Sequence, residues 1–490
     1  MKKYSLLSLS VAVLTACAPI VEPVIIVEPT PWPTDVYGII VSENPTMIGG
    51  DTVKIRIDKG LKESLLSDKA SYPEAFFLVG DQVVGYKEPK LHTPPVKDPD
   101  LSKIKNNDDP DLKGKPLRMV AIGGSLTAGV RDGGYFNEGI LTSFPNLIAR
   151  QMKLKKFEQP LFEGTDYNGF GRKVLTDFNP TGGPAPKFKA VSNNSAFTGE
   201  FEEKLPKLKK YNGLVDNWSY PYNGSSGFEL PWLSKGPYYG RIEPVDKKEK
   251  YIVYSEQLLK EKFDFFLLEK GWSADGVFRS TQSLVRNGFP NPIENLLKEY
   301  RKRNYRGVIM NSPDFWDFPL NTVLKPEMIL KVPDFAFRFS SLYSPTGVKI
   351  SNFVIRPNST IDSVLSEKVH VTLKPQKLPS QTIIQEVVVL ESKNSLSEEN
   401  SSMLEFSQKY NYPLVDFYSI FKKIFRGEYI TDDGVRVDGK YPTGNFFSSD
   451  MMLPTAFGQA VIANEVIKTM NGFYKTEIPM IPTREYLQVK

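Results

Sequence analysis

"VAIGGSLTAGVRDGG", from Val120 to Gly134, begins as an apolar strand and continues into a glycine-rich turn. Two glycines directly precede Ser125, and glycine permits backbone angles that a tight strand-to-helix turn requires. A side chain in this position is presented at the carboxyl edge of a parallel sheet, where open α/β sheets bind their ligands. The stretch therefore predicts an α/β fold with Ser125 as a candidate nucleophile. The alternative is a hydroxyl that caps a helix in a purely structural turn.

Strands and helices alternate on the carboxyl side of Leu117, which predicts a parallel sheet with helices on both faces. Two stretches, 176–212 and 318–382, do not follow the alternation and are interpreted as insertions over the top of the sheet. The predicted strands are Leu117–Gly124, Phe263–Gly271, Arg306–Ser312, Ile383–Ser392 and Pro413–Phe417, and the predicted helices are Gly139–Leu154, Ile293–Arg303, Ser401–Tyr410 and Ala456–Tyr474.

Length and composition indicate a globular protein. The chain has 490 residues, of which 40% are hydrophobic and 12% aromatic, enough for one large domain with additions. Its formal charge of +5 is small for this length, so no nucleic-acid partner is expected. With two histidines and one cysteine, no Cys/His metal cluster and no cofactor are expected. The acidic stretch Ile430–Lys440 lacks the spacing of a calcium loop and is interpreted as a turn before a hairpin.

The amino terminus has the pattern of a secretory signal. A basic start is followed by a short apolar run, Leu6–Leu14, and then by Leu-Thr-Ala-Cys ending at Cys17. This pattern resembles the bacterial lipobox, which implies a signal peptide over residues 1–16 and acyl chains such as palmitate on a lipidated Cys17. Residues 17–34 would then be a tether to the membrane. An ordinary signal peptide with an incidental cysteine is the alternative.

Three further sections follow the tether. Residues 35–115 are predicted to form a small β-rich section that ends in a polar linker, residues 116–478 the main domain, and residues 479–490 a tail. A lipidated Cys17 would leave no cysteine for a disulfide within the chain. Such a protein would be anchored to the outer membrane, on its periplasmic face or at the cell surface.

The Ser125 stretch resembles block I of the SGNH, or GDSL, esterase and lipase family, in particular lipid-anchored members from Bacteroidota. The segments "SFPNLIARQMKL", "FEQPLFEGTDYNGFG", "GVIMNSPDFWDFPLNTV" and "PTAFGQAVIANEVIKTMNGFY" also resemble that group, so the resemblance covers about Leu117 to Ile478. It implies a three-layer α/β/α fold of flavodoxin-like type and ester hydrolysis by a serine. In that family the oxyanion hole uses the serine N–H, a glycine N–H and an asparagine side chain, and an Asp-x-x-His pair activates the serine.

Carried over to this chain, the resemblance implies an incomplete site. Ser125 keeps the nucleophile position and Asp450 the position of the acid, but Leu453 replaces the histidine. Tyr222 stands where the family has the glycine of the oxyanion hole, and Ser273 stands where it has the asparagine. A serine hydroxyl is a weak nucleophile without a base, so the loss of the histidine predicts a large loss of activity, on the order of 10⁴–10⁶-fold.

Other bases remain alternatives. The two histidines, His92 and His370, would have to fold over Ser125 to replace the missing one, whereas a structural role is the commoner fate of a lone histidine. Asp450 has a simpler interpretation as a helix N-cap or loop residue before the Pro454 helix.

Three functions follow from these observations. The first is a catalytically inactive, lipid-anchored subunit that binds or scaffolds an outer-membrane protein partner. The second is an active serine esterase or lipase that acts on acyl esters or acetylated glycans through Ser125. The third is a glycan-binding lipoprotein, because Asn212–Leu233 combines aromatic with short polar residues that suit a sugar surface.

Overall fold

We analysed a computed structural model of the chain. It describes residues 91–163, 166–177, 187–191, 195–202, 205–221, 237–244, 254–270, 291–326, 353–357 and 383–487, together with four short strands at 46–48, 51–53, 76–79 and 82–86.

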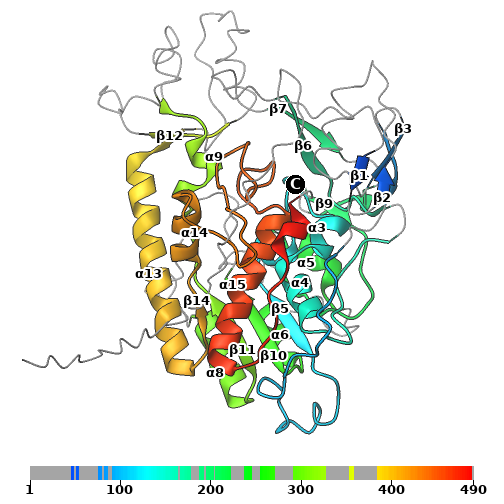
Figure 1. The fold of residues 1–490 in the computed structure, drawn as a ribbon, viewed down its shortest axis with the longest axis vertical. Coiled ribbons are helices and arrows are strands. Elements are labelled where there is room, and N and C mark those ends of the chain that lie inside the picture. Colours follow the sequence, from blue (N-terminus) through cyan, green and yellow to red (C-terminus); the bar gives the residue numbers. More distant parts are fainter. Residues whose placement is uncertain are drawn as a thin grey trace, which may run out of the picture.

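The centre of the fold is a parallel sheet of four strands in the order β14-β11-β10-β5 (Figure 1). Leu267 lies opposite Ala121 on one side and Val308 on the other, and all three strand pairings are parallel. Every residue of β5 and β10 is buried, as expected for strands that are covered on both faces. The strands are β5 (Met119–Ile122), β10 (Phe265–Glu269), β11 (Arg306–Met310) and β14 (Leu414–Val415).

A short extended segment lies along the free edge of β5. Asn217 forms a parallel bridge with Ala121, the Ala121 N–H donates to the Asp216 carbonyl over 2.8 Å, and the Trp218 N–H donates to the Ala121 carbonyl over 2.8 Å. The segment at Asn217 thus lies on one side of β5, and the next strand of the sheet, β10, lies on the other side. The strand order therefore reverses at β5. Such a reversal opens a crevice at the carboxyl ends of the strands, which is the usual ligand position in open α/β sheets.

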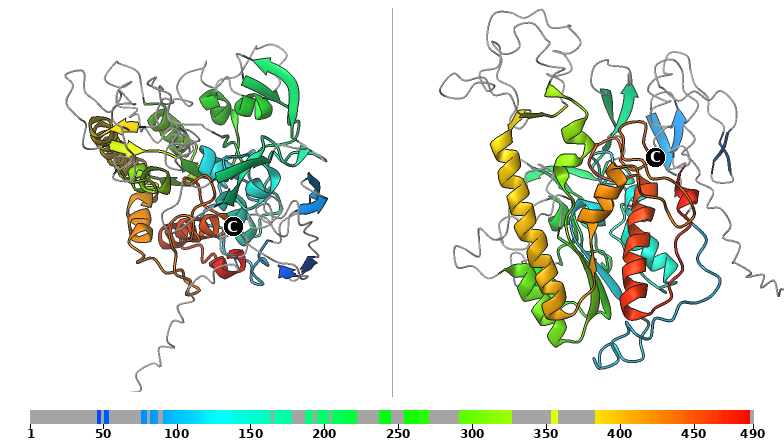
Figure 2. Two further views of the ribbon diagram at one scale, coloured as in Figure 1. Left: turned by 90° about the horizontal axis from the view of Figure 1, so that it is seen from above. Right: turned by 60° about the vertical axis from the view of Figure 1, so that its left-hand side comes forward.

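Helices cover both faces of the sheet, as the alternation predicts (Figure 2). Neighbouring residues of β10 point to opposite faces: the Phe265 ring packs 5.8 Å from Tyr474, and the Phe266 ring packs 5.1 Å from Tyr300. Tyr474 ends α15 (Ala456–Tyr474) and Tyr300 belongs to α8 (Pro292–Lys302). In Figure 2, α13 (Glu386–Tyr410) and α15 lie on opposite sides of the strands. These findings confirm the predicted α/β class with a parallel sheet.

The remaining elements are short. Within the described residues, five antiparallel pairs lie outside the main sheet: β1 with β2, β3 with β4, β6 with β7, β8 with β9, and β12 with β13. These strands are β1 (Thr46–Ile48), β2 (Asp51–Val53), β3 (Phe76–Val79), β4 (Gln82–Tyr86), β6 (Arg172–Asp177), β7 (Lys187–Val191), β8 (Phe197–Glu202), β9 (Leu205–Leu208), β12 (Phe353–Ile355) and β13 (Ile383–Gln385). The other helices are α2 (Ser125–Ala128), α3 (Asn137–Leu141), α4 (Phe144–Gln151), α5 (Pro237–Ile242), α6 (Tyr254–Lys260), η3 (Phe315–Asp317), α9 (Pro319–Thr322), α14 (Phe417–Phe425) and η5 (Thr483–Tyr486).

One predicted strand is wrong. Ile383–Ser392 does not join the sheet, because only Ile383–Gln385 is extended, in an antiparallel pair, and the 25-residue helix α13 begins at Glu386. Val387 and Leu390 are 53% and 54% exposed, so this apolar run is not a buried strand. A short apolar run does not distinguish strand from helix by pattern alone, and the packing of α13 against α8 decides the outcome here. The helix predicted over Gly139–Leu154 is divided into α3 and α4, with Pro145 in the first turn of α4.

The polar linker and the carboxyl-terminal segment pack on the main domain. In the polar linker, Lys105 forms an ion pair with buried Asp264 at 2.9 Å, just before β10. Near the carboxyl terminus, η5 contacts α15 and buries Tyr486. Within the described part of the chain, no helix is long and apolar enough to cross a membrane.

Candidate functional site

Ser125 lies where the glycine pattern predicts it, directly after β5. It is the first residue of α2, a four-residue helix that ends at Gly129 in the left-handed conformation with φ of 83°. Its side chain faces inward, since the residue is only 4% exposed. The hydroxyl is therefore at the carboxyl edge of the sheet but is largely closed off from solvent.

A buried carboxylate from the neighbouring strand closes this turn. Glu269 ends β10 and is 1% exposed; its Oε2 accepts from the Gly124 N–H over 3.0 Å and from the Thr127 hydroxyl over 2.9 Å. A Cβ atom on Gly123 would lie 2.7 Å from this oxygen and 2.4 Å from Thr127 Oγ1, so a larger residue would force these side chains to move. Glu269 therefore fixes the backbone of the turn that carries Ser125. Our sequence analysis missed Glu269, although an acidic residue at the end of an otherwise apolar strand was a usable signal.

Asp450 is held by the backbone around it. Its Oδ1 accepts from the N–H groups of Met452 and Leu453 over 2.8 and 2.7 Å, and its Oδ2 accepts from the Gly133 N–H over 3.1 Å. Burial raises the pKa of this carboxyl above its usual value, and these hydrogen bonds oppose the rise. Both carboxylate oxygens therefore stabilise the loop and the adjoining turn.

Leu453 contributes to the hydrophobic core. It is 7% exposed, and its carbonyl accepts from the Ser448 N–H over 2.8 Å, which closes the loop that carries Asp450. The helix that follows is capped by Thr455, whose hydroxyl accepts from the Gly458 N–H over 3.1 Å. Of the two structural roles that the sequence offered for Asp450, the loop role is the one observed, and the N-cap is Thr455.

A second buried carboxylate, which sequence analysis also missed, joins the two segments. Asp132 follows α2 with a left-handed backbone, φ of 54°. Its N–H donates to the Ser448 hydroxyl over 3.0 Å, and its Oδ1 accepts from the Ser449 N–H over 2.8 Å. Burial, aided by the nearby Asp450 charge, raises the pKa of Asp132 to about 7, although the hydrogen bonds from Ser449 and the charge of Arg172 oppose the rise. No local pattern announces this residue, because its partners are more than 300 positions away.

Neither histidine is found beside Ser125 in the described part of the chain. His92 is fully buried, with Nδ1 2.7 Å from the Tyr486 hydroxyl and Nε2 2.9 Å from Gln151 Oε1. Burial and the positive charge of Arg150 lower the pKa of His92 to about 4, so it stays neutral at physiological pH. Both ring nitrogens thus have structural partners on α4 and η5. His370 lies outside the described residues, as do the candidate positions Cys17, Tyr222 and Ser273.

One side-chain amide does reach the turn. Asn217, on the edge segment beside β5, donates through Nδ2 to the Thr127 carbonyl over 3.1 Å and to Gln159 Oε1 over 2.8 Å. Its Oδ1 accepts from the Ser219 N–H over 3.2 Å. Because these bonds use both ends of the amide, Asn217 supports α2 from below and is not oriented as a donor to a ligand.

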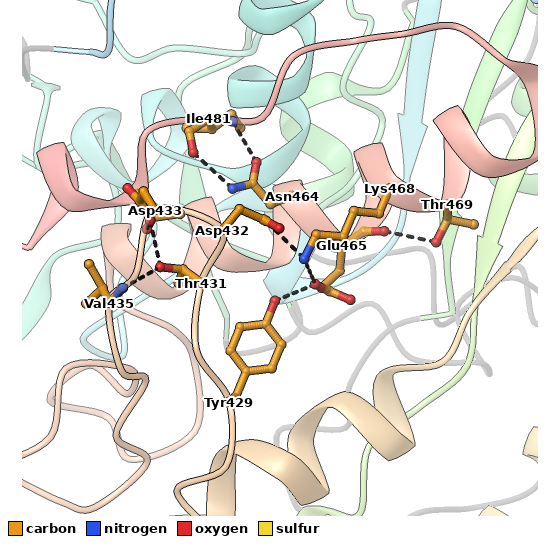
Figure 3. Close-up of polar contacts among 11 residues, drawn as sticks. Tyr429, Thr431, Asp432, Asp433, Val435, Asn464, Glu465, Lys468, Thr469 and Ile481 are labelled. Carbon is orange, nitrogen blue, oxygen red and sulfur yellow. Dashed lines mark hydrogen bonds and ion pairs between the residues drawn. The ribbon is translucent and has the colours of Figure 1, made fainter. Parts of the chain in front are cut away.

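The acidic stretch Ile430–Lys440 is a structural turn (Figure 3). Asp433 accepts from the Thr431 hydroxyl over 2.6 Å, and Asp432 forms an ion pair with Lys468 of α15 at 3.0 Å. An antiparallel bridge joins Ile430 and Arg436, so the stretch itself forms a tight turn. Among the described residues, no group of three or more His, Cys, Asp or Glu side chains could hold a metal ion.

No protein-family model matches the chain, and neither a curated protein nor a solved structure matches it significantly. The chemistry of the site therefore has to be inferred from its own residues.

Proposed function

We propose that this chain is a catalytically silent SGNH-like lipoprotein that acts as a binding or scaffolding subunit at the outer membrane. One observation carries the proposal: both oxygens of Asp450 bond to backbone amides, and the residue three positions later is the buried Leu453. In a serine hydrolase, the carboxylate of the acid orients the imidazole that takes the proton of the serine. Here both oxygens of that carboxylate already accept from the backbone.

Two further features support the loss of hydrolysis. The Gly124 N–H of the Ser125 turn donates to Glu269, and His92 has both ring nitrogens engaged elsewhere. The parallel sheet, its strand order and the two covering layers of helices are compatible with the α/β/α arrangement of the SGNH family. The proposal thus combines a maintained framework with a site where the position of the family histidine is held by Leu453.

The envelope location rests on the lipobox-like sequence at Cys17. Replacing Cys17 with serine is expected to abolish incorporation of radiolabelled palmitate and to release the protein from the membrane fraction. Two or more acyl chains hold a protein stably on a membrane. A wild-type protein recovered in the soluble fraction would therefore count against the anchor. Co-purification from detergent tests the partner: a wild-type protein recovered only as a monomer would argue against a scaffolding role.

A fluorophosphonate probe tests the catalytic half of the proposal. The full-length protein in detergent is expected to label no more than its Ser125→Ala variant, since Leu453, at the position of the family histidine, cannot accept the hydroxyl proton. An active serine esterase serves as the positive control for the probe. Labelling of the wild type that disappears in Ser125→Ala would overturn the proposal, and its disappearance in His370→Ala as well would identify the base.

A further inference from the structure

The outer face of α13 carries an apolar row. Leu404 is 49% exposed, and Val387 and Leu390 are exposed to a similar extent. Residues three or fourteen positions apart lie on one side of a helix, so these three side chains follow one another along α13. In Figure 1, α13 stands at the outer margin of the helices, and the row therefore faces away from the sheet.

The inner face of α13 is partly polar. Glu399 on this face pairs with buried Lys270 at 2.5 Å, and Ser392 and Ser402 are buried as well. Apolar and polar residues are consequently less separated in α13 than in α8 or α14, whose apolar side chains are buried on one side. A helix with apolar residues on two faces is typical of a helix that is covered on both, which indicates a second partner for α13 besides the sheet.

A line of glutamates borders the apolar row. Glu391, Glu398 and Glu405 are all exposed. They stand seven positions apart, which places them one above the other over two helical turns at a time. The outer face of α13 is therefore an apolar row with an acidic border.

The lysines of α13 do not offset this border. Lys393 Nζ lies 3.8 Å from Asp314, and Lys409 Nζ lies 2.7 Å from Glu294 of α8, so both ammonium groups face carboxylates of neighbouring elements. A second copy of the chain would oppose two acidic borders, because a two-fold axis brings the same flank of both helices together. Like charges that face each other cost affinity, so the outer face suits a different chain that carries cations.

We propose that the outer face of α13 docks an amphipathic helix that has an apolar row and a flank rich in lysine or arginine. Burial of the two apolar rows against each other supplies affinity, and the cations opposite the glutamates fix the orientation of the bound helix. Such a helix would belong to the partner of the scaffolding role proposed above, on which this assignment rests, and it docks whether or not Ser125 is catalytic.

Fluorescence anisotropy of the full-length protein in zwitterionic lipid nanodiscs tests this docking. The probe is a fluorescent synthetic helix as long as α13, with leucine along one row and lysine along one flank; its twin has glutamate in place of every lysine. The lysine helix is expected to bind saturably with Kd below about 100 µM, and the twin at least about tenfold more weakly. Empty nanodiscs give the background from lipid.

Substitutions in the apolar row locate the binding. Leu390→Gln combined with Leu404→Gln is expected to weaken binding of the lysine helix at least about tenfold, and glutamine maintains α13 because it is a good helix former. The matched control is Phe473→Gln, which removes an exposed ring on α15 and should leave binding unchanged.

Substitutions in the acidic border test the charge of the partner. Glu391→Gln combined with Glu405→Gln should weaken the lysine helix toward its twin and reduce the effect of added salt. Glu428→Gln, at an exposed carboxylate outside α13, should change neither.

Four results would overturn the inference. They are no binding of the lysine helix, equal binding of its twin, unchanged binding by the double leucine variant, and a wild-type dimer that this variant dissociates, since a second copy would then occupy the face. Failure here leaves the fluorophosphonate result untouched. Conversely, labelling at Ser125 together with intact binding of the lysine helix would remove the proposed silence and keep the docking face.

Discussion

The carboxyl edge of the central sheet, formed by the carboxyl ends of its strands, and the amino edge, formed by their amino ends, differ in how their polar groups are used. At the carboxyl edge, Ser125, Glu269 and Asp132 are almost completely buried, and neighbouring backbone groups or side chains hold the carboxylates. At the amino edge, Arg118 and Glu261 are ordered in the same way but line an open groove. The edge where such sheets usually bind ligands is closed, and the opposite edge is accessible. Polar residues at a strand end thus indicate a ligand-binding site only where a ligand can reach them.

The largest effect should come from a buried ion pair at the carboxyl edge. Lys270, directly after β10, pairs with Glu399 of α13 at 2.5 Å, and both side chains are 1% exposed. Glu399→Ala leaves a buried ammonium without its carboxylate and is expected to lower the free energy of unfolding by about 3–5 kcal/mol. Urea denaturation measures the loss.

Glu261→Ala is the matched control at the amino edge. Its partner Arg118 keeps Asp216 and two carbonyls, and the two side chains are 31% and 15% exposed, so a loss within about 1 kcal/mol is expected. Similar losses for the two variants would contradict the contrast between a closed and an open edge.

Asp450→Ala should have the next largest effect. It removes the acceptor of three backbone N–H groups, from Gly133, Met452 and Leu453, and a loss of about 1–3 kcal/mol is expected. Asp450→Asn keeps one acceptor oxygen and should lose less. Thermal unfolding distinguishes the two variants, and an unchanged melting temperature in Asp450→Ala would show that these bonds do not stabilise the loop.

The Asp132 carboxyl should make stability depend on pH. Its pKa is raised to about 7 in the folded chain, so between pH 4 and 7 the folded state binds a proton that the unfolded state has released. The free energy of unfolding should therefore fall as pH rises through this window.

Asp132→Asn should remove most of this slope. Asparagine tolerates the left-handed backbone at this position and keeps the oxygen that accepts from Ser449. Denaturation curves at pH 5 and pH 8 provide the measurement. An unchanged slope in the variant, or a wild-type stability that rises with pH, would contradict a raised pKa of the Asp132 carboxyl.

The smallest effect is expected for Leu453→His, which should leave fluorophosphonate labelling unchanged. Leu453→His restores an imidazole at the position of the family base, but Asp450 already bonds to the backbone of this loop through both oxygens. Fluorophosphonate labelling of Leu453→His should therefore stay at the level of Leu453→Ala, which controls for lost packing. Labelling that appears in Leu453→His and disappears when Ser125 is also replaced would show a carboxyl edge that lacks only its base.

Local patterns predicted the framework well. The strand before Ser125 and the helix Ala456–Tyr474 have the predicted positions because apolar runs and glycine turns act over neighbouring residues. The three valines at 387–389 misled the analysis, since β-branched residues favour strands and only tertiary packing makes this run helical. The edge segment at Asn217 was not predicted, because a single bridge leaves no periodic pattern.

The candidate site was less predictable than the framework. The sequence identified Ser125, Asp450 and Leu453, but the role of each depends on distant partners. The hydrogen bond from Gly133 to Asp450 joins residues 317 positions apart, and the one from Gly124 to Glu269 spans 145. No spacing rule covers such distances, so the environment of the serine had to come from the three-dimensional structure.

The tight contact at Gly123 has a consequence for how related chains would diverge. Any larger residue would collide with Thr127 and Glu269, so unfolding penalises substitution there whether or not Ser125 ever attacks an ester. A lineage that had abandoned hydrolysis would therefore still keep glycine at this position, because folding alone maintains it.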